Sequence, residues 1–297
     1  MHEIFAAGFF SSEPVHTALL VGAVIAITSA VVGVFTVTRG QSFAGHSLAD
    51  VATTGGSGAF LVGLNQFWGY LAFGAGAAAF MELVGIQRKR GRDVATGVVL
   101  GAALGLSALF LYLDTQTSST TGATVTVMFG SMWEITSSTV PELIVSALLA
   151  LFTVLALARP LLLSSLSPDI AAARGVPVRL LGAAFLMALA ISVALSAVII
   201  GAVLSTALLI GPAATALRIA KGPVKAMVTA AAVGTAATWL GVLLSYDSQN
   251  WPPNHGGDWP VSFFVVALVV LAYLITYLRP ARVQRTQTDM EHTCSPA

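Results

Sequence analysis

The sequence is dominated by long apolar stretches that are separated by short polar segments. A transmembrane α-helix needs ~17–25 mostly apolar residues, because it must cross ~30 Å of hydrocarbon at ~1.5 Å per residue. Stretches that meet this requirement occupy 17–38, 67–86, 94–113, 140–158, 224–245 and 261–278. Only 9% of the residues are charged, whereas soluble domains carry about 25%. The chain is therefore predicted to be an all-α integral membrane protein.

Two further apolar stretches complete the predicted set of spans. Residues 43–64 are apolar apart from a histidine and an aspartate, and 180–217 is too long for one crossing, so it predicts a hairpin of two helices. An amphipathic patch at 123–136 is not counted as a span. We expect about nine transmembrane helices, with eight to ten as the range. They form a single domain over 1–280, followed by a polar tail over 281–297 that we expect to be disordered.

The basic residues predict the orientation of the chain in the membrane. Short loops rich in Lys and Arg stay in the cytoplasm. Under the span assignment above, one side receives Arg39, the cluster Arg88–Arg92, then Arg159, Arg174 and Arg179, then Arg218, Lys221 and Lys225, and finally Arg279, Arg282 and Arg285. The other side receives almost none. We therefore expect the N-terminus outside and the C-terminus, with its tail, inside.

His46 and Asp50 stand out because they lie inside a predicted span. Side chains four residues apart share one face of a helix, and Ser42, Thr53 and Ser57 extend the same polar stripe. A charged group at bilayer depth costs at least ~2.5–3.5 kcal/mol, so such residues are usually functional. The pair is therefore a candidate site. The alternative is a hydrogen-bonded pair that only fixes helix packing.

An imidazole and a carboxylate suit a divalent metal ion in transit. These donors accept Mn²⁺, Fe²⁺ or Zn²⁺ and disfavour Cu(I), which prefers sulfur ligands. A transit site must replace part of the ion's water without holding the ion permanently, so no resident cofactor is expected. Two ligands are too few for a closed site, but a symmetric homodimer would supply four. His255 and Asp258 are weaker metal candidates, because NHGGD equally forms a plain turn.

Other polar residues and charges narrow the possible functions. Asp114 and Glu134 are expected in solvent or at the membrane interface. The single cysteine, Cys294, lies in the tail and excludes an internal disulfide. A formal net charge of +1 on so few charged residues gives no basic surface for nucleic acid. No G-x-x-x-x-G-K-[ST] motif is present, so any ATP hydrolysis must occur on another chain.

A glycine pattern in the span 94–113 predicts a close helix contact. Gly97, Gly101 and Gly105 recur every four residues, and such small-xxx-small patterns let two helix backbones approach closely. The contact could lie within one subunit or form the seam of a dimer. The sequence leaves both readings open.

The basic loop 159–179 predicts a short surface helix. Ser167 has the character of an N-cap, Pro168 of a first helical residue, Asp169 of a favourable first-turn charge and Gly175 of a C-terminal stop. This helix is either an ordinary connector between two spans or a docking element for a cytoplasmic partner.

Three stretches together resemble one family, the membrane permeases of ABC importers for zinc, manganese and chelated iron. They are R-G-Q-S-F-A-G-H-S-L-A-D at Arg39–Asp50, F-G-S-M-W-E-I-T-S at Phe129–Ser137, and S-P-D-I-A-A-A-R-G-V-P at Ser167–Pro177 with the hairpin I-I-G-A-V-L-S-T-A-L-L-I-G-P-A-A-T-A at Ile199–Ala216. The resemblance implies a transport subunit, not an enzyme, in the plasma membrane of a prokaryote. It also implies a cytoplasmic ATPase, an extracytoplasmic metal-binding protein and two permease copies.

The resemblance assigns roles to some residues and exposes one departure. It implies that Asp169, Ala173 and Gly175 contact the ATPase, and that Pro212, which is expected to kink its helix, belongs to a translocation-pathway helix. Where the family has Asp this chain has His46, and where the family has His it has Asp50. The proline that the family places before the glycine at Gly55 is also absent.

A second class of transporter fits the polar pair. In an ion-coupled secondary transporter, His46 and Asp50 would relay protons or metal. Such proteins show paired broken helices in two related halves, and no internal repeat of that kind is evident in this sequence.

Overall fold

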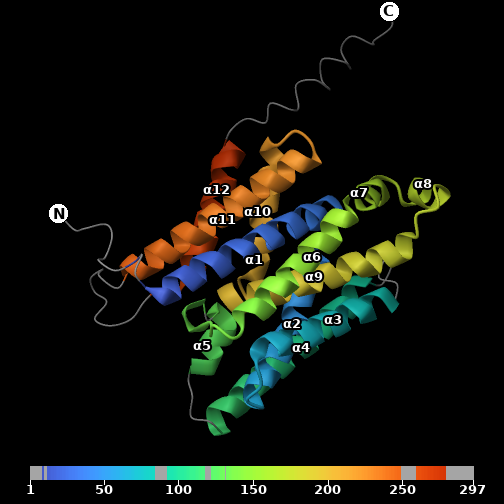
Figure 1. Cartoon of the computed structure of the whole chain (residues 1–297). Helices are drawn as coiled ribbons and strands as arrows, with labels where there is room; N and C mark the ends of the chain where they lie inside the picture. The colour runs from blue at the N-terminus through green and yellow to red at the C-terminus, as the bar shows by residue number, and fades with distance from the viewer. Residues whose placement is uncertain are drawn as a thin grey trace, which may run out of the picture.

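The computed structural model describes Phe9 and residues 12–83, 92–117, 122–130, 132–248 and 259–278. Within these ranges every regular element is a helix (Figure 1). In chain order they are α1 (Glu13–Thr38), α2 (Ser42–Leu61), α3 (Gln66–Leu83), α4 (Arg92–Thr117), α5 (Gly122–Phe129), the 3-10 turn η2 (Met132–Glu134), α6 (Val140–Ala156), α7 (Ala158–Leu166), α8 (Pro168–Ala173), α9 (Val178–Ile200), α10 (Ser205–Ile219), α11 (Pro223–Asp247) and α12 (Val261–Leu278).

Each predicted span coincides with a helix, and the all-helical prediction is confirmed for the described residues. The break expected within 180–217 is found between α9 and α10. Four of the described helices, α1, α9, α11 and α12, are long and apolar enough to cross a membrane by themselves, and α6 with α7 adds a fifth if that bent pair is one span. The full count of nine crossings stays a prediction.

Helix α6 ends earlier than the apolar run that encodes it. The chain bends by 57° between α6 and α7, and α7 is a helix where the sequence predicts part of a loop. Pro160 explains the bend. It has no N–H to bond the carbonyl of Ala156, and its ring clashes with the preceding turn of a straight helix. As a result α7 turns away from α6 and carries the chain toward α8.

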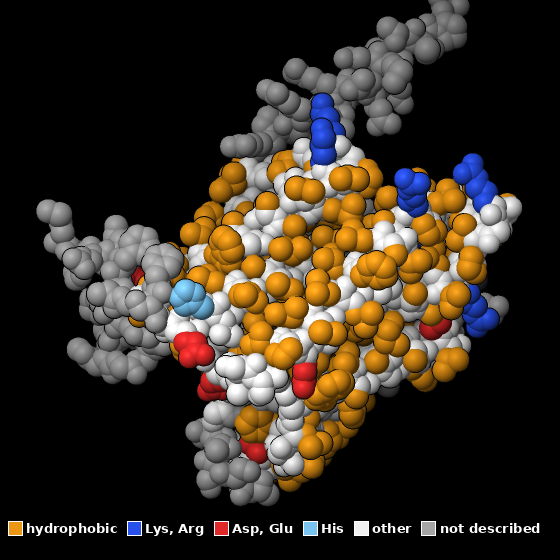
Figure 2. All heavy atoms as spheres, in the orientation of Figure 1, with side chains coloured by type: hydrophobic (Ala, Val, Ile, Leu, Met, Phe, Trp, Pro, Cys, Tyr) orange, Lys and Arg blue, Asp and Glu red, His pale blue; other side chains and the backbone are white. Residues whose placement is uncertain are grey.

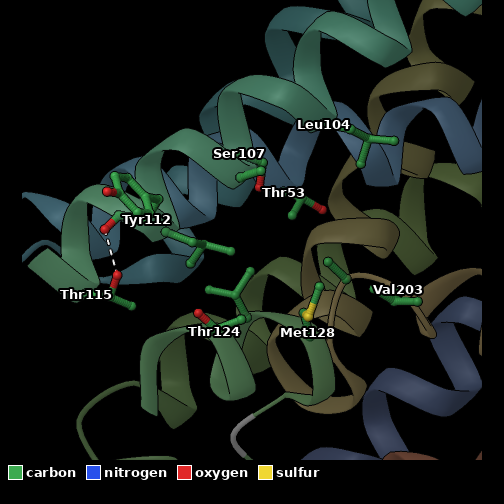
Figure 3. Close-up of a pocket in the computed structure, with 12 residues that line it drawn as sticks. Thr53, Leu104, Ser107, Tyr112, Thr115, Thr124, Met128 and Val203 are labelled. Carbon is green, nitrogen blue, oxygen red and sulfur yellow. Dashed lines mark hydrogen bonds between the residues drawn. The ribbon is translucent and has the colours of Figure 1, made fainter. Parts of the chain in front are cut away.

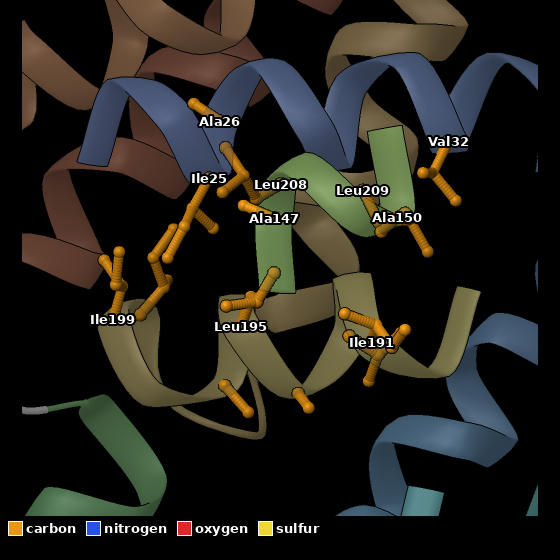
Figure 4. Close-up of a cluster of buried hydrophobic side chains, with 14 of the residues drawn as sticks. Ile25, Ala26, Val32, Ala147, Ala150, Ile191, Leu195, Ile199, Leu208 and Leu209 are labelled. Atoms are coloured by element: carbon orange, nitrogen blue, oxygen red, sulfur yellow. The ribbon is translucent and has the colours of Figure 1, made fainter. Parts of the chain in front are cut away.

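Helix α1 lies at the centre of the bundle. It packs against α6, α9, α10 and α11, and most of its side chains are buried. Figure 4 shows this core, which contains Ile25 and Val32 of α1, Ala147 of α6, Leu195 of α9 and Leu208 of α10. Large apolar side chains also cover the outer surface (Figure 2). Helices that are apolar on every face are typical of a bundle surrounded by lipid.

A close helix contact joins α2 to α3. A Cβ atom added at Gly55 would overlap the carbonyl oxygen of Gly69, and one added at Gly69 would overlap that of Gly55. The glycines predicted for such a contact behave differently. Gly101 and Gly105 have nothing within 4 Å of an added Cβ, so no residue that the structure describes packs closely against them. The surroundings of Gly97 lie outside the described residues.

The start of the turn between α9 and α10 packs against the end of α5. Gly130 and Gly201 both have a positive φ, of 84° and 87°, which glycine adopts without strain. A Cβ at Gly130 would overlap the carbonyl of Ile199, and one at Gly201 would overlap that of Met128. The amide of Ala202 donates to the carbonyl of Val127 at 3.0 Å. Two of the stretches that carry the family resemblance, Phe129–Ser137 and Ile199–Ala216, are therefore in direct backbone contact.

Charged side chains separate toward opposite ends of the bundle. Figure 2 shows Lys and Arg at the end that carries α8 and the α10–α11 turn, while most Asp and Glu lie at the other end. Glu82 is an exception, and its Oε1 lies 3.9 Å from Nε of Arg179. This separation is what the basic residues of the sequence predict for the described part of the chain.

Candidate functional site

Helix α2 brings the two ionisable residues onto one face. Nε2 of His46 lies 3.6 Å from Oδ2 of Asp50, one helical turn away. The side chain of His46 is 52% exposed and that of Asp50 is 15% exposed. The contact agrees with the spacing in the sequence. Both groups have one side against the protein and one side open, so an incoming ion could reach both.

The C-terminal half of the predicted polar stripe, Thr53 and Ser57, is turned into the protein. Oγ1 of Thr53 donates to the carbonyl of Ala49 at 2.7 Å, and Oγ of Ser57 donates to the carbonyl of Thr53 at 2.8 Å. Ser57 also lies 3.2 Å from the hydroxyl of Ser107 on α4. Both residues are buried. Their protons are used by the helix backbone, so they support α2 instead of offering free donors to a solute.

A cavity adjoins this buried half of the stripe. It has a volume of about 300 Å³ and lies between α2, α4, α5 and the α9–α10 turn (Figure 3). Its walls are mostly apolar, including Leu104, Met128 and Val203. Hydroxyls line part of it, from Thr53, Ser107, Thr115 and Thr124. Because four separate segments form the cavity, no local sequence pattern could have predicted it. Thr53 places it one helical turn beyond Asp50.

The pair is an incomplete metal site in a single chain. No group of three or more His, Cys, Asp or Glu side chains that could hold a metal occurs among the residues the structure describes. His46 and Asp50 can therefore supply two ligands, and the remaining positions would be filled by water or by another chain. His255 and Asp258, the weaker metal candidates, lie outside the described residues.

The predicted surface helix is present as α8. Oγ of Ser167 accepts a hydrogen bond from the amide of Ile170 at 3.4 Å, which is the expected N-cap. Gly175 ends the segment with a φ of +79°. Asp169 and Ala173, like Gly175, are exposed. These features confirm the local structure, and the ATPase contact of the three residues stays a prediction.

Pro212 lies inside α10, which continues as a helix on both sides of it. The residue is buried, and its ring faces α11, where a Cβ added at Gly234 would lie 3.6 Å from Cγ of Pro212. Its role in a translocation pathway stays a prediction.

One carboxylate is placed differently from the expectation. Asp114 is only 2% exposed, so its side chain is not in solvent, whereas Glu134 is exposed as expected. The reason is that α4 extends to Thr117, past the predicted end of the span. Asp114 therefore continues the buried side of the helix that includes Ser107 and Leu111.

Comparisons with known proteins bear on this arrangement. Residues 11–280 match the sequence model of the ABC 3 transport family. The manganese transport system membrane protein MntC of Listeria monocytogenes is 28% identical over 244 residues, which cover 82% of this chain and 85% of that protein. The high-affinity zinc uptake system membrane protein ZnuB of Haemophilus influenzae is 25% identical over 242 residues, covering 81% and 92%. The solved structure of PsaBC from Streptococcus pneumoniae in complex with Fab superposes with a TM-score of 0.79 at 24% identity, covering 95% and 97%.

Proposed function

Because the chain belongs to the ABC 3 transport family, we propose that it is the membrane permease subunit of an ATP-driven importer for a divalent metal ion. The permease does not hydrolyse ATP. A separate cytoplasmic ATPase supplies that activity, and an extracytoplasmic binding protein delivers the metal. The metal is the cargo and not a resident cofactor. The chain resides in the plasma membrane of a prokaryote.

The observation that carries this proposal is the His46–Asp50 pair on α2. The two groups lie 3.6 Å apart and both are partly open, within a helix whose other residues are mostly apolar or small. Ionisable groups in such a helix are usually functional. Imidazole with carboxylate suits Mn²⁺, Zn²⁺ and Fe²⁺, and the named relatives are a manganese and a zinc system.

We further propose the orientation and extent of the transport domain. Residues 1–280 form one domain that crosses the membrane nine times, with the N-terminus outside and the tail from 281 in the cytoplasm. The separation of basic from acidic side chains supports this orientation. It places α8 on the cytoplasmic side, where Asp169, Ala173 and Gly175 would meet the ATPase.

A second copy of the chain would complete the metal site. The side chain of His46 is 52% exposed in a single chain, and contact of an imidazole with lipid would be unfavourable. Phe43 on the preceding turn is also 48% exposed. A homodimer with the two α2 helices facing its axis would cover this face and provide four ligands. The open glycines Gly101 and Gly105 leave a further seam available on α4.

The dimer predicts a specific cross-link. In a Cys294→Ser background, Phe43→Cys is expected to form a covalent dimer with a short bismaleimide in native membranes, because residue 43 would approach its own copy. Val228→Cys on α11, which is 65% exposed, is the matched control and should stay monomeric on a denaturing gel. Equal cross-linking of both variants, or none at Phe43→Cys, would contradict an axis at α2.

Reconstitution tests the transport function directly. Proteoliposomes that contain the permease, its ATPase and the metal-loaded binding protein should accumulate ⁵⁴Mn²⁺ or ⁶⁵Zn²⁺ only when ATP is present. Omission of the ATPase should stop uptake. Uptake without an ATPase, driven by a pH gradient, would overturn the proposal and favour the ion-coupled secondary transporter. If uptake requires ATP and the ATPase, the metal content of the purified binding protein would identify the transported ion.

A further inference from the structure

Arg39 occupies the junction between the central helix and the helix that carries the polar pair. It follows α1 directly and precedes α2 by three residues. The connecting turn is tight, since Gly40 has a φ of +63° and the amide of Gln41 donates to the carbonyl of Thr36 at 2.8 Å. So short and well-bonded a turn makes the start of α2 follow any displacement of Arg39.

The side chain of Arg39 reaches across to α7. Its Nη1 donates to Oγ of Ser164 at 2.8 Å and lies 3.4 Å from the carbonyl oxygen of Leu161. Its guanidinium carbon also lies 5.3 Å from the ring centroid of Phe185 on α9, within the range of a cation–π contact. Figure 1 shows the C-terminal end of α1 beside α7. One side chain therefore joins the α1–α2 turn to two other helices.

The charge of Arg39 has no carboxylate partner among the described residues. Neither ion pair of 4.0 Å or less found in the described ranges includes it. Its Nε is buried without a hydrogen-bond partner, and burial lowers the pKa of Arg39 below its ordinary value. Partial burial of a charge that has no opposite charge beside it costs free energy. Fold stability alone therefore gives no reason for an arginine here, whereas its fork of donors can hold a carbonyl and a hydroxyl together.

Helix α7 is followed directly by the mostly exposed helix α8. Ser167 both ends α7 and caps α8. Ala171 on α8 is fully buried, and its carbonyl accepts from the amide of Val176 at 3.1 Å. The 57° bend separates α7 from α6, and α7 and α8 pack against each other, so a displacement of α8 would be passed to α7. The atoms that Arg39 holds would shift with them.

We propose that Arg39 is a positioning residue that transmits displacement of α8, through α7, to the metal-bearing helix α2. This role rests on the proposed function, in which α8 receives the ATPase. Hydrolysis changes the position of α8, and the guanidinium carries that change to the turn from which α2 starts. Loss of the link leaves ATP hydrolysis intact but separates it from metal movement.

The ratio of metal imported to ATP hydrolysed tests this role in proteoliposomes with the ATPase and loaded binding protein. Arg39→Met keeps an apolar stem and removes every donor. It is expected to lower the ratio by about five- to tenfold, the size of a modest coupling between two sites. ATPase retention and basal hydrolysis should stay at the wild-type level. Arg39→Lys keeps one compact donor group, so its ratio of metal imported to ATP hydrolysed should lie between those of the wild type and Arg39→Met.

Matched variants separate coupling from general damage. Arg218→Met makes the same change at an exposed arginine that stacks on Tyr277, and its ratio should equal that of the wild type. Ser164→Ala removes one acceptor and should lower the ratio partly, with no further effect in the Arg39→Met background. If Arg39→Met fails to assemble, Arg39→Lys and Ser164→Ala provide the test.

The possible failures are distinguishable. Absence of ATP-driven uptake by the wild type would overturn the proposed function itself. Normal wild-type uptake with unchanged ratios in Arg39→Met, or in both Arg39→Lys and Ser164→Ala, would overturn only the coupling role.

Discussion

Uptake of metal is expected to fall by at least about 100-fold when Asp50 is replaced by alanine, because even groups that merely orient a ligand change metal affinity or activity by ~10–100-fold. His46→Ala is expected to have a similar effect. Both residues face the open side of α2 at a mutual distance of 3.6 Å, and neither anchors the core. The ATPase should still co-purify, and uptake of ⁵⁴Mn²⁺ or ⁶⁵Zn²⁺ is the measurement.

Glu82→Ala is the matched control for that experiment. Its carboxylate is 19% exposed and lies 3.9 Å from Arg179, close to the 15% exposure and 3.6 Å contact of Asp50. It lies on α3 and contacts Arg179 of α9, not His46 or Asp50, so uptake should persist. Undiminished uptake in both Asp50→Ala and His46→Ala would exclude the pair as transit ligands and leave the packing role.

The exchanged order of the pair can be tested in the same assay. The double variant His46→Asp/Asp50→His restores the order found in the family while keeping one imidazole and one carboxylate on the face. It should transport more metal than either alanine variant, with changed preference between Mn²⁺ and Zn²⁺. Complete inactivity of a folded double variant would indicate that the depth of each ligand is fixed by this chain's own surroundings.

Loss of the ATPase is the expected result of Gly175→Trp. Gly175 is exposed, follows α8 and has nothing within 4 Å of an added Cβ, so an indole there would project from the surface proposed for docking. We expect the ATPase to dissociate on purification, or its metal-stimulated turnover to fall to the basal rate. Affinity co-purification and ATP hydrolysis are the measurements.

Backbone strain must be separated from blocked docking in that variant. Gly175 has a φ of +79°, and any other residue there is strained. Gly222 offers the same conditions, with a φ of +97°, open space around an added Cβ and a place at the same end of the bundle. Gly222→Trp should retain the ATPase. Equal loss in both variants, or retention in both, would count against docking at α8.

The features that the sequence predicted are those set by local chemistry. Apolar runs located the helices because the bilayer core excludes unpaired backbone groups, and Ser167 and Gly175 marked the ends of α8 through their capping preferences. The spacing of His46 and Asp50 likewise predicted their shared face. Each of these inferences depends on residues within a turn or two of each other.

What could not be predicted depends on which helix becomes a neighbour. A glycine repeat indicates close packing only if another helix lies opposite it. Gly55 packs against α3, whereas Gly105 has open space around an added Cβ. The link from Arg39 to Ser164 spans 125 residues of sequence, and the cavity beyond Asp50 has walls from four segments. Asp114 was misplaced because α4 extends one turn past the apolar run.

The central position of α1 also affects how the chain is assembled during synthesis. α1 leaves the ribosome before α10 and α11, yet it packs against both, and its Leu19 carbonyl accepts from Nε1 of Trp239 at 3.0 Å. At ~5–20 residues per second, roughly 10–40 s separate the end of α1 from the start of α11. For that interval the membrane itself, and any insertion factor beside it, must shield a helix whose final neighbours have not yet been made.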